Sequence, residues 1–249
     1  MNLLPISVLI LSLNEENNIA DAIKSSDFAK EIIVVDAESS DQTAHIALNM
    51  GAQVIINPWK NETTQRRFAL EKASENWILF LDADERISPE LAQELMHLDW
   101  HNPRLNPGFE IPFQSYYLNH PIRWGDWRGE SHVRLFRKAT VLISDRAVHC
   151  EIKCQNQDAP LGRLKGKILH FSFPTLETVL EKINRYSSLG AEAKIDLGKK
   201  GGFWKAVIRG LWTFIRGYIF KLGFLDGKYG FMLAVSNAEG CYYKYLKMG

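Results

Sequence analysis

Two aspartates separated by one residue, Asp82 and Asp84, follow directly on the apolar run from Trp77 to Leu81, and Glu85 comes next. Two carboxylates at this spacing, at the end of a buried strand, can both reach one hard divalent cation through oxygen. Such a cation can hold a diphosphate and neutralise the charge that develops on it as it leaves. Short acidic pairs are common, so the surrounding elements decide what this pair predicts.

Polar residues also follow two other apolar runs. Asn14 and Glu15 come after the run from Ile6 to Leu13, and Asp36 comes after the run from Glu31 to Val35. Continuous apolar strands separated by helices predict an α/β fold whose parallel sheet is covered on both faces. Ligands bind such sheets at the carboxyl ends of the strands, so these residues and the acid pair should share one rim. Each one alone can equally be a helix cap or a turn residue.

The middle of the chain, from Asn102 to His170, is rich in Pro, Gly, Trp and Tyr and predicts extended, irregular structure. Its segment WGDWRGESHVRLF carries two tryptophans among charges, a combination that suits sugar rings and also suits a small aromatic core. The last eighty residues predict three helices, over the ranges Thr175 to Ile195, Phe203 to Leu222 and Tyr229 to Lys247.

The second of these helices is amphipathic. Lys205, Arg209 and Arg216 fall on one side at helical spacing, with large apolar residues on the opposite arc. A basic helix that bears tryptophans is typical of a membrane interface. The alternative is a helix that packs its apolar face on the rest of the protein, and the pattern leaves both open.

Composition limits the class of protein. The net charge is +1, so no overall field favours nucleic acid as a partner. The three cysteines, Cys150, Cys154 and Cys241, make no disulfide framework and favour a reducing cytosol. The apolar N-terminus has no basic segment or cleavage site typical of a signal peptide, and no apolar run is long enough to span a membrane.

The chain resembles the family 2 glycosyltransferases, which have the GT-A fold, in three segments of its first 95 residues: SVLILSLNEENNI, IIVVDAESSDQT and ILFLDADE. Five later segments resemble the bacterial transferases that build the lipopolysaccharide core, typified by the core β-1,4-glucosyltransferase: HVRLFRK, VHCE, GRLKGKILHFS, INRYS and GFLDGKYGFMLA. The resemblance implies three regions. Residues 1–100 are the nucleotide-sugar-binding half of the GT-A domain, residues 101–172 are its acceptor-side half, and residues 173–249 are a helical region that can associate with membrane.

The resemblance also assigns roles to residues that bind the donor. It implies that the nucleotide base and ribose are bound near Leu13, Asn14, Glu15 and Asp36. Asp82 and Asp84 would bind Mg²⁺ or Mn²⁺ and, through it, the diphosphate. Gln65 and Arg66 would line the donor pocket, where Arg66 has the chemistry for a phosphate contact. The alternative for Arg66 is a solvated helix face.

The family inverts the anomeric centre in one displacement, and a carboxylate must take the proton of the acceptor hydroxyl. Glu130 is the first candidate because it precedes HVRLF, where the subgroup has Asp. Glu151 is the second, although His149-Cys150-Glu151 displaces it by one residue from the His-Glu of the subgroup. Asp126 is a third candidate. For each acid alone, a surface or ion-pair role is the alternative.

Two histidines, His149 and His170, can supply a third metal ligand or a diphosphate contact; the alternative is a packed or hydrogen-bonded histidine. Together with Cys150 and Cys154 they also raise the possibility of structural zinc, but the spacing matches no known ribbon or finger.

The resemblance, together with the acid pair, implies a metal-dependent inverting glycosyltransferase. It would move a hexose from a UDP-sugar to a membrane-attached glycan, the lipopolysaccharide inner core, as a peripheral protein on the cytoplasmic face of the inner membrane. The alternatives are transfer to polyprenyl phosphate or to another envelope polysaccharide, and a non-catalytic membrane-surface scaffold with the same fold. A sugar nucleotidyltransferase is disfavoured because LSLNEENN replaces its Gly-rich basic loop, and a dehydrogenase because no G-x-G-x-x-G follows the first strand.

Overall fold

The structure is a computed structural model that describes residues 3–143, 152–154 and 160–249. The chain divides into two compact units, which are treated separately. The first unit contains residues 1–113 and 130–170, and the second contains residues 114–129 and 171–249. The three-region division at residues 100 and 172 stays a prediction.

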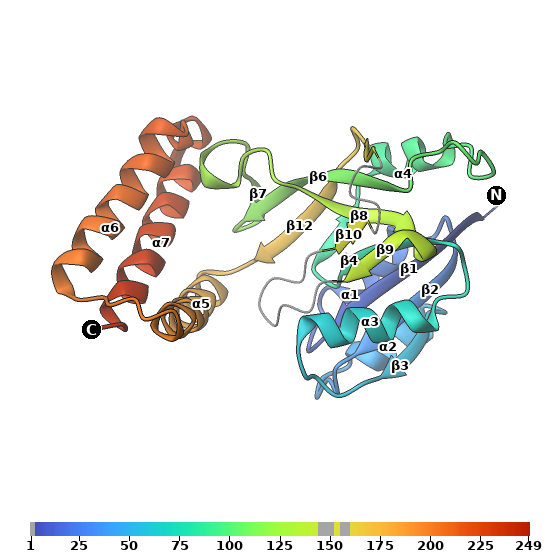
Figure 1. The fold of residues 1–249 in the computed structure, drawn as a ribbon, viewed down its shortest axis with the longest axis horizontal. Coiled ribbons are helices and arrows are strands. Elements are labelled where there is room, and N and C mark those ends of the chain that lie inside the picture. Colours follow the sequence, from blue (N-terminus) through green and yellow to red (C-terminus); the bar gives the residue numbers. More distant parts are fainter. Residues whose placement is uncertain (1–2, 144–151, 155–159) are drawn as a thin grey trace. The chain divides into compact units, whose positions relative to one another are not determined.

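The first unit begins with a parallel sheet, in which β1 lies between β2 and β4 and β3 pairs with β2 (Figure 1). Its strands are β1 (Leu4–Ser12), β2 (Ala29–Asp36), β3 (Gln53–Ile56) and β4 (Trp77–Asp82). The connecting helices are α1 (Ile19–Lys24), α2 (Thr43–Asn49) and α3 (Glu62–Lys72). Strands and helices alternate along the chain as the apolar runs predict.

Beyond β4 the sheet continues in the order β4-β8-β6-β12-β5, in which the pairs β4-β8, β8-β6 and β12-β5 are antiparallel. Its further strands are β5 (Glu85–Ile87), β6 (Gly108–Tyr117), β7 (His120–Pro121), β8 (Ser131–Arg137), β11 (Gly162–Arg163) and β12 (Ile168–Phe173). The strands β9 (Val141–Ile143) and β10 (Ile152–Cys154) form a separate pair. The first unit also contains the short helices α4 (Pro89–Met96) and η2 (Lys138–Thr140), whereas η1 (Gly125–Trp127) and the strand β7 belong to the second unit. The sheet is therefore mixed: the parallel strands β1 to β4 lie in the first hundred residues, and one further parallel pair joins β11 to β6.

The core shows why this sheet is covered on both faces. Along β1, the side chains of Val8 and Ile10 belong to one buried cluster, whereas Leu9 belongs to another. The first cluster includes residues of α1 and α4, and the second includes Ala69 of α3. Because successive strand residues face opposite sides, an unbroken apolar run is needed to fill both clusters. The predicted α/β class of the GT-A type is confirmed in this arrangement.

The second unit is mainly helical and agrees with the three predicted helices. It contains α5 (Leu176–Asp196), α6 (Phe203–Ile215), a π-helical turn η3 (Arg216–Phe220), a short turn η4 (Gly223–Asp226) and α7 (Gly227–Leu246). In the described part of the chain, no helix combines the length and the apolar character that crossing a membrane requires.

The helices α6 and α7 lie alongside one another (Figure 1). The contact uses small residues of α6, since Ala206 and Gly210 are buried. A Cβ atom on Gly210 would lie 3.2 Å from the Cβ atom of Tyr242 on α7. The small residues allow this close approach and leave most of the large apolar side chains of α6 outside the contact.

Candidate active site

The carboxyl ends of the parallel strands form one rim in the first unit. Residue pairing in the sheet places Ser12 beside Asp36, and Leu11 beside Asp82. The ends of β1, β2 and β4 are therefore level, as in other sheets that bind ligands at this edge. The rim predicted from the sequence is present in the structure.

Asp36 ties together the loops that follow β1 and β2. Its buried carboxylate accepts hydrogen bonds from the hydroxyl of Ser12 at 3.0 Å, and from the backbone N–H and hydroxyl of Ser39 at 2.8 and 2.6 Å. The backbone N–H of Asn14 donates to the Ser39 hydroxyl at 2.8 Å, and its side-chain oxygen accepts from the backbone N–H of Ser40 at 2.8 Å. The two loops thus form one hydrogen-bonded unit.

Strained backbone marks the same two loops. Asn14 has a φ angle of 55° and Glu38 a φ angle of 60°, values that residues with a Cβ atom seldom adopt. The backbone N–H of Glu15 donates to the Thr43 hydroxyl at 2.7 Å, while Leu13 exposes its apolar side chain at the rim. Leu13, Asn14, Glu15 and Asp36 therefore lie on neighbouring loops at the end of the sheet.

The first acid of the pair is held by two arginines. One oxygen of Asp82 lies 3.1 Å from a guanidinium nitrogen of Arg66, and the other lies 3.2 Å from one of Arg134. Removal from water acts to raise the pKa of Asp82, but the charges of Arg66 and Arg134 outweigh it and hold this pKa well below its usual range. Asp82 is therefore ionised.

Arg66 reaches Asp82 from α3 and is only 4% exposed, so the alternative of a solvated helix face is wrong. Its Nε also donates to Glu62 at 2.9 Å, and its guanidinium lies over the ring of Phe80. Its buried Nη1 atom has no hydrogen-bond partner among the described residues. The side chain of the neighbouring Gln65 instead bonds to Asn57.

Glu85 lies beneath the acid pair with 1% of its side chain exposed. One of its oxygens accepts a hydrogen bond from Arg134 at 2.7 Å, and the other accepts from the backbone N–H of Asp82 at 2.8 Å. Burial, helped by the negative charge of Asp82, raises the pKa of Glu85 to about 7 against the opposing charge of Arg134. Glu85 thus fixes the turn that carries the two aspartates.

The second acid of the pair faces a histidine. An oxygen of Asp84 lies 3.5 Å from Nε2 of His170, which belongs to β12. Burial acts to lower the pKa of His170, but the hydrogen bond and charge of Asp84, followed by the charges of Glu85 and Asp82, raise it above its usual value. His170, one of the two predicted histidines, is therefore beside the acid pair.

A divalent cation fits the chemistry of this pair. Carboxylate oxygen and imidazole nitrogen are both ligands that Mn²⁺ accepts, and Mg²⁺ uses one or two carboxylates together with phosphate and water. In residues 3–143, 152–154 and 160–249, no three His, Cys, Asp or Glu side chains form a ready-made metal site. Asp84 and His170 would therefore supply only part of a ligand shell. His149, the other predicted ligand, lies outside the described residues.

The three candidate bases lie in different parts of the chain. Glu130 precedes β8 in the first unit, and one of its oxygens lies 2.9 Å from Nε2 of His132. This hydrogen bond is the main cause that lowers the pKa of Glu130. Asp126 belongs to the second unit and pairs there with Arg216 and Lys221. Glu151, with the Cys150 of the zinc alternative, lies outside the described residues.

Comparison with protein families decides the class. The model named "Glycosyl transferase family 2" matches residues 7–144, more than half of the chain. The chain belongs to glycosyl transferase family 2. Its matched region includes the rim, the acid pair and Glu130, and its family membership makes this protein a glycosyltransferase.

Relatives of this family 2 glycosyltransferase match nearly its whole length. An uncharacterised glycosyltransferase of Rickettsia prowazekii is 30% identical, with 98% of this chain and 86% of the relative covered. The lipopolysaccharide core biosynthesis glycosyltransferase LpsC of Rhizobium meliloti is 28% identical, with 94% of this chain and 88% of LpsC covered.

Solved structures resemble only part of the chain. Glucosyl-3-phosphoglycerate synthase of Mycobacterium tuberculosis, crystallised with Mn²⁺ and UDP, has a TM-score of 0.36 and 25% identity, over 45% of this chain and 43% of the synthase. S. aureus TarS in complex with UDP-GlcNAc has a TM-score of 0.38 and 23% identity, over 47% of this chain and 35% of that one.

The site contains one residue that sequence reasoning did not assign to it. Arg134 lies in the segment HVRLFRK, to which the sequence assigns no role in the site, yet it bonds both Asp82 and Glu85. Its one signal is that it is the single charged residue in the apolar segment from Val133 to Phe136. Alternation along a strand places Arg134 on the opposite face from Val133 and Leu135, so this signal does not predict burial; in the structure Arg134 is 8% exposed and pairs with carboxylates, as a buried arginine must.

Proposed function

We propose that this family 2 glycosyltransferase is metal-dependent and inverting, and that it moves a hexose from a UDP-sugar to a membrane-attached glycan of the lipopolysaccharide core. The observation that carries the proposal is the arrangement at the end of β4. There a D-x-D pair is held by two buried arginines and a buried glutamate, with His170 beside Asp84. Such a site binds an anion and a cation together.

The nucleotide would lie on the rim formed by the loops after β1 and β2. The exposed Leu13 offers an apolar surface for a flat base, and Asn14 and Glu15 offer polar groups for the base and ribose. Asp36 would act on the donor indirectly. Its buried carboxylate accepts three hydrogen bonds, and these set the shape of the two loops. Its part in donor binding is therefore to position the rim.

The diphosphate would lie between the acid pair and Arg66. In this proposal Asp82 and Asp84, with His170 beside them, would hold the divalent metal, and His149 would be a further ligand. When bound, the metal neutralises charge on the departing diphosphate. The buried Nη1 of Arg66 has no hydrogen-bond partner among the described residues, and its N–H groups can donate to a phosphate oxygen. Arg134 holds Asp82 and Glu85 in place.

The proton of the acceptor hydroxyl would pass to Glu130. His132 keeps this carboxylate ionised, as a base must be before the reaction begins. The hydroxyl oxygen then attacks the anomeric carbon as the bond from that carbon to the diphosphate breaks, and the proton remains on the carboxyl of Glu130. Glu151 is the second candidate for this role.

The proposed acceptor is inferred from the relative LpsC. The proposed location is inferred from α6 in the second unit. LpsC of Rhizobium meliloti is named as a glycosyltransferase of lipopolysaccharide core biosynthesis. The exposed apolar side chains of α6 and its basic residues suit a peripheral position on the cytoplasmic face of the inner membrane.

Calorimetry tests the proposal. UDP, GDP and dTDP would be titrated, each with and without Mn²⁺, into the wild type and into the Asp82→Asn/Asp84→Asn variant. We expect binding of UDP that needs Mn²⁺ and is lost in the double variant. Absence of binding by all three nucleotides would overturn the proposed donor class, and equal binding with and without Mn²⁺ would overturn the role of the metal.

A further inference from the structure

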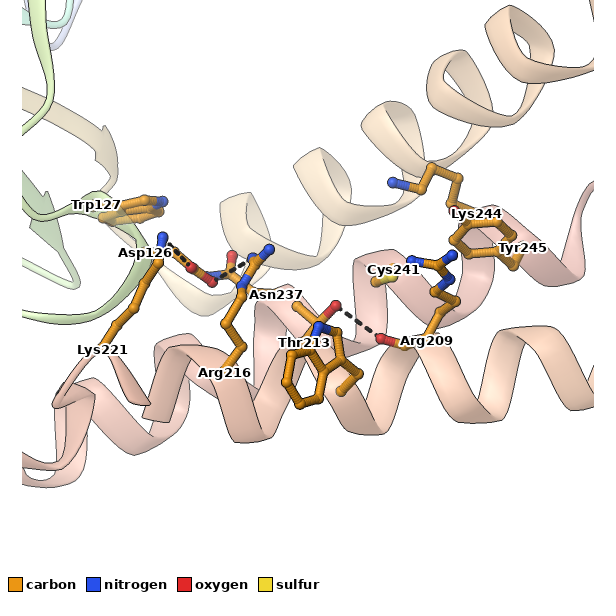
Figure 2. A pocket seen from close by; sticks show the side chains of 11 residues that line it. Asp126, Trp127, Arg209, Thr213, Arg216, Lys221, Asn237, Cys241, Lys244 and Tyr245 are labelled. Atoms are coloured by element: carbon orange, nitrogen blue, oxygen red, sulfur yellow. Dashed lines mark hydrogen bonds and ion pairs between the residues drawn. The ribbon is translucent and has the colours of Figure 1, made fainter. Parts of the chain in front are cut away.

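The second unit contains a cavity of about 480 Å³ that the proposed reaction does not use (Figure 2). It lies along α6 and α7, with residues of η1 at one end. Its volume is in the range of small-molecule sites. Four cationic side chains and one carboxylate line it: Arg209, Arg216, Lys221, Lys244 and Asp126.

The single carboxylate occupies one end of the cavity. Asp126 lies 3.1 Å from a guanidinium nitrogen of Arg216 and 2.9 Å from Nζ of Lys221, as the dashed lines of Figure 2 show. Gly217 permits this approach, because a Cβ atom there would lie 3.0 Å from an oxygen of Asp126. Asp126 therefore holds two of the four cations in fixed positions and balances one positive charge.

The other two cations lie at the opposite end. Arg209 and Lys244 both lie over the ring of Tyr245, at 5.9 and 5.6 Å from its centre. Within the second unit, all of which the structure describes, neither forms an ion pair with a carboxylate. Lys194 and Lys205 lie over the same ring. This concentration of unbalanced positive charge favours binding of an anion.

A second, apolar cavity of about 210 Å³ adjoins the first. The two cavities share Trp127, Asn237 and Lys244. Apolar side chains line the second one: Phe173, Val179, Ile183 and Leu233. A basic cavity that opens beside an apolar one suits a ligand with an anionic head and an apolar tail.

The outer surface of α6 and η3 is apolar. Trp204 is 74% exposed and Phe220 is 66% exposed, and Ile208, Leu211 and Trp212 are exposed between them. Large exposed apolar side chains on a basic helix are typical of a surface that enters the lipid headgroup region. The basic cavity would then open near the headgroups.

We infer that the cavity between α6 and α7 binds the phosphate group of a lipid headgroup that carries net negative charge. Arg209 and Lys244 donate hydrogen bonds to the phosphate oxygens, and the guanidinium of Arg209 can use two parallel N–H groups. Arg216 and Lys221, held by Asp126, supply positive charge at the other end. The inference depends on the proposed function only for the membrane location of the protein.

Vesicle binding by the full chain tests this inference. Co-sedimentation would compare vesicles of phosphatidylcholine alone with vesicles that also contain phosphatidylglycerol. The wild type would be compared with Arg209→Gln/Lys244→Gln and with a matched control, Lys199→Gln/Lys200→Gln, which removes two exposed cations outside the cavity. We expect the cavity variant to lose at least about tenfold more affinity for the anionic vesicles than the control, because it removes two donors of charge-assisted hydrogen bonds.

Equal losses in the two variants would overturn the inference, because only overall charge would then matter. Calorimetry with inorganic phosphate separates the sources of phosphate. Binding of free phosphate without a preference for anionic vesicles would overturn the lipid as ligand. The Arg209→Lys/Lys244→Arg variant keeps both charges and should retain vesicle binding, and thermal unfolding of every variant identifies loss of fold.

The same preparations separate this inference from the proposed function. Titration of UDP and Mn²⁺ into the wild type reports on the donor site alone. If UDP does not bind but the cavity variant still loses vesicle binding, the proposed function fails and the lipid site stands. If UDP binds but the cavity and control variants behave alike, the donor site stands and the lipid site fails.

Discussion

The acid pair of the first unit and the basic cavity of the second unit differ in how far their charged side chains have partners of opposite charge. At the end of β4, three neighbouring acids, Asp82, Asp84 and Glu85, each have a basic partner within 3.5 Å. In the cavity, Asp126 is the single acid among four cations. The first arrangement is held rigidly by the sheet, whereas the second gathers charge on helix surfaces. The difference indicates that the first site is pre-organised and that the second needs an anion from outside.

The largest expected effect comes from removing the cation that two buried acids share. Arg134→Met leaves Glu85 and Asp82 without this partner, and breaking a buried pair in this way costs about 3–5 kcal/mol of unfolding free energy. Urea unfolding at neutral pH would measure the loss. The matched control is Arg163→Met, because Arg163 is exposed in the same unit and should change stability by less than about 0.5 kcal/mol. Equal changes in the two variants would contradict the idea of a pre-organised charge network.

The next effect concerns catalysis. Asp84→Asn keeps the shape of the side chain but removes the negative charge that the proposed metal needs, so we expect sugar transfer to fall roughly 10²–10³-fold. Thermal unfolding should show that the fold is retained. Asp27→Asn, an exposed acid in the same unit, serves as the control and should transfer sugar at the wild-type rate. Transfer by Asp84→Asn within about threefold of wild type would remove Asp84 from the site, since a lost metal ligand costs several kcal/mol.

A smaller effect should appear as a pH dependence of stability. Glu85 has its pKa raised from 4.5 to about 7 by burial, so the folded protein keeps a proton that the unfolded chain has already released. Its contribution to stability is fully present below pH 4.5 and is lost as the pH rises through about 7. Glu85→Gln should therefore flatten the fall in unfolding free energy across this range, by on the order of 1–3 kcal/mol. An unchanged slope in the variant would show that another group controls it.

Sequence reasoning predicted the rim well, for a physical reason. The end of a buried strand is marked by a sharp change from apolar to polar residues, and Asp36 and Asp82 both end strands as expected. It did not predict that Arg134 would bond Asp82, because strand pairing between β8 and β4 is a contact between distant segments. Periodicity describes one element at a time and gives no partner.

The helix from Phe203 illustrates the same limit. Its apolar arc left packing and membrane contact equally open, and the structure packs it through Ala206 and Gly210. Small residues carry little hydrophobic signal, yet they decide how closely two helices approach. The large apolar residues that dominate the pattern are mostly left exposed, which is why hydrophobicity alone could not identify the buried face.

The smallest expected effect completes the comparison between the two regions. Arg209→Met removes a cation that is exposed and that has no carboxylate partner in the second unit, all of which is described, so no buried charge is left behind. We expect the unfolding free energy to stay within about 0.5 kcal/mol of wild type, or to rise slightly because the repulsion from Lys205 and Lys244 is relieved. Urea unfolding at low ionic strength, where repulsion is least screened, gives the most sensitive reading. A loss comparable to that of Arg134→Met would mean that the cavity, like the acid pair, is a fully balanced network and that its cations already have internal partners.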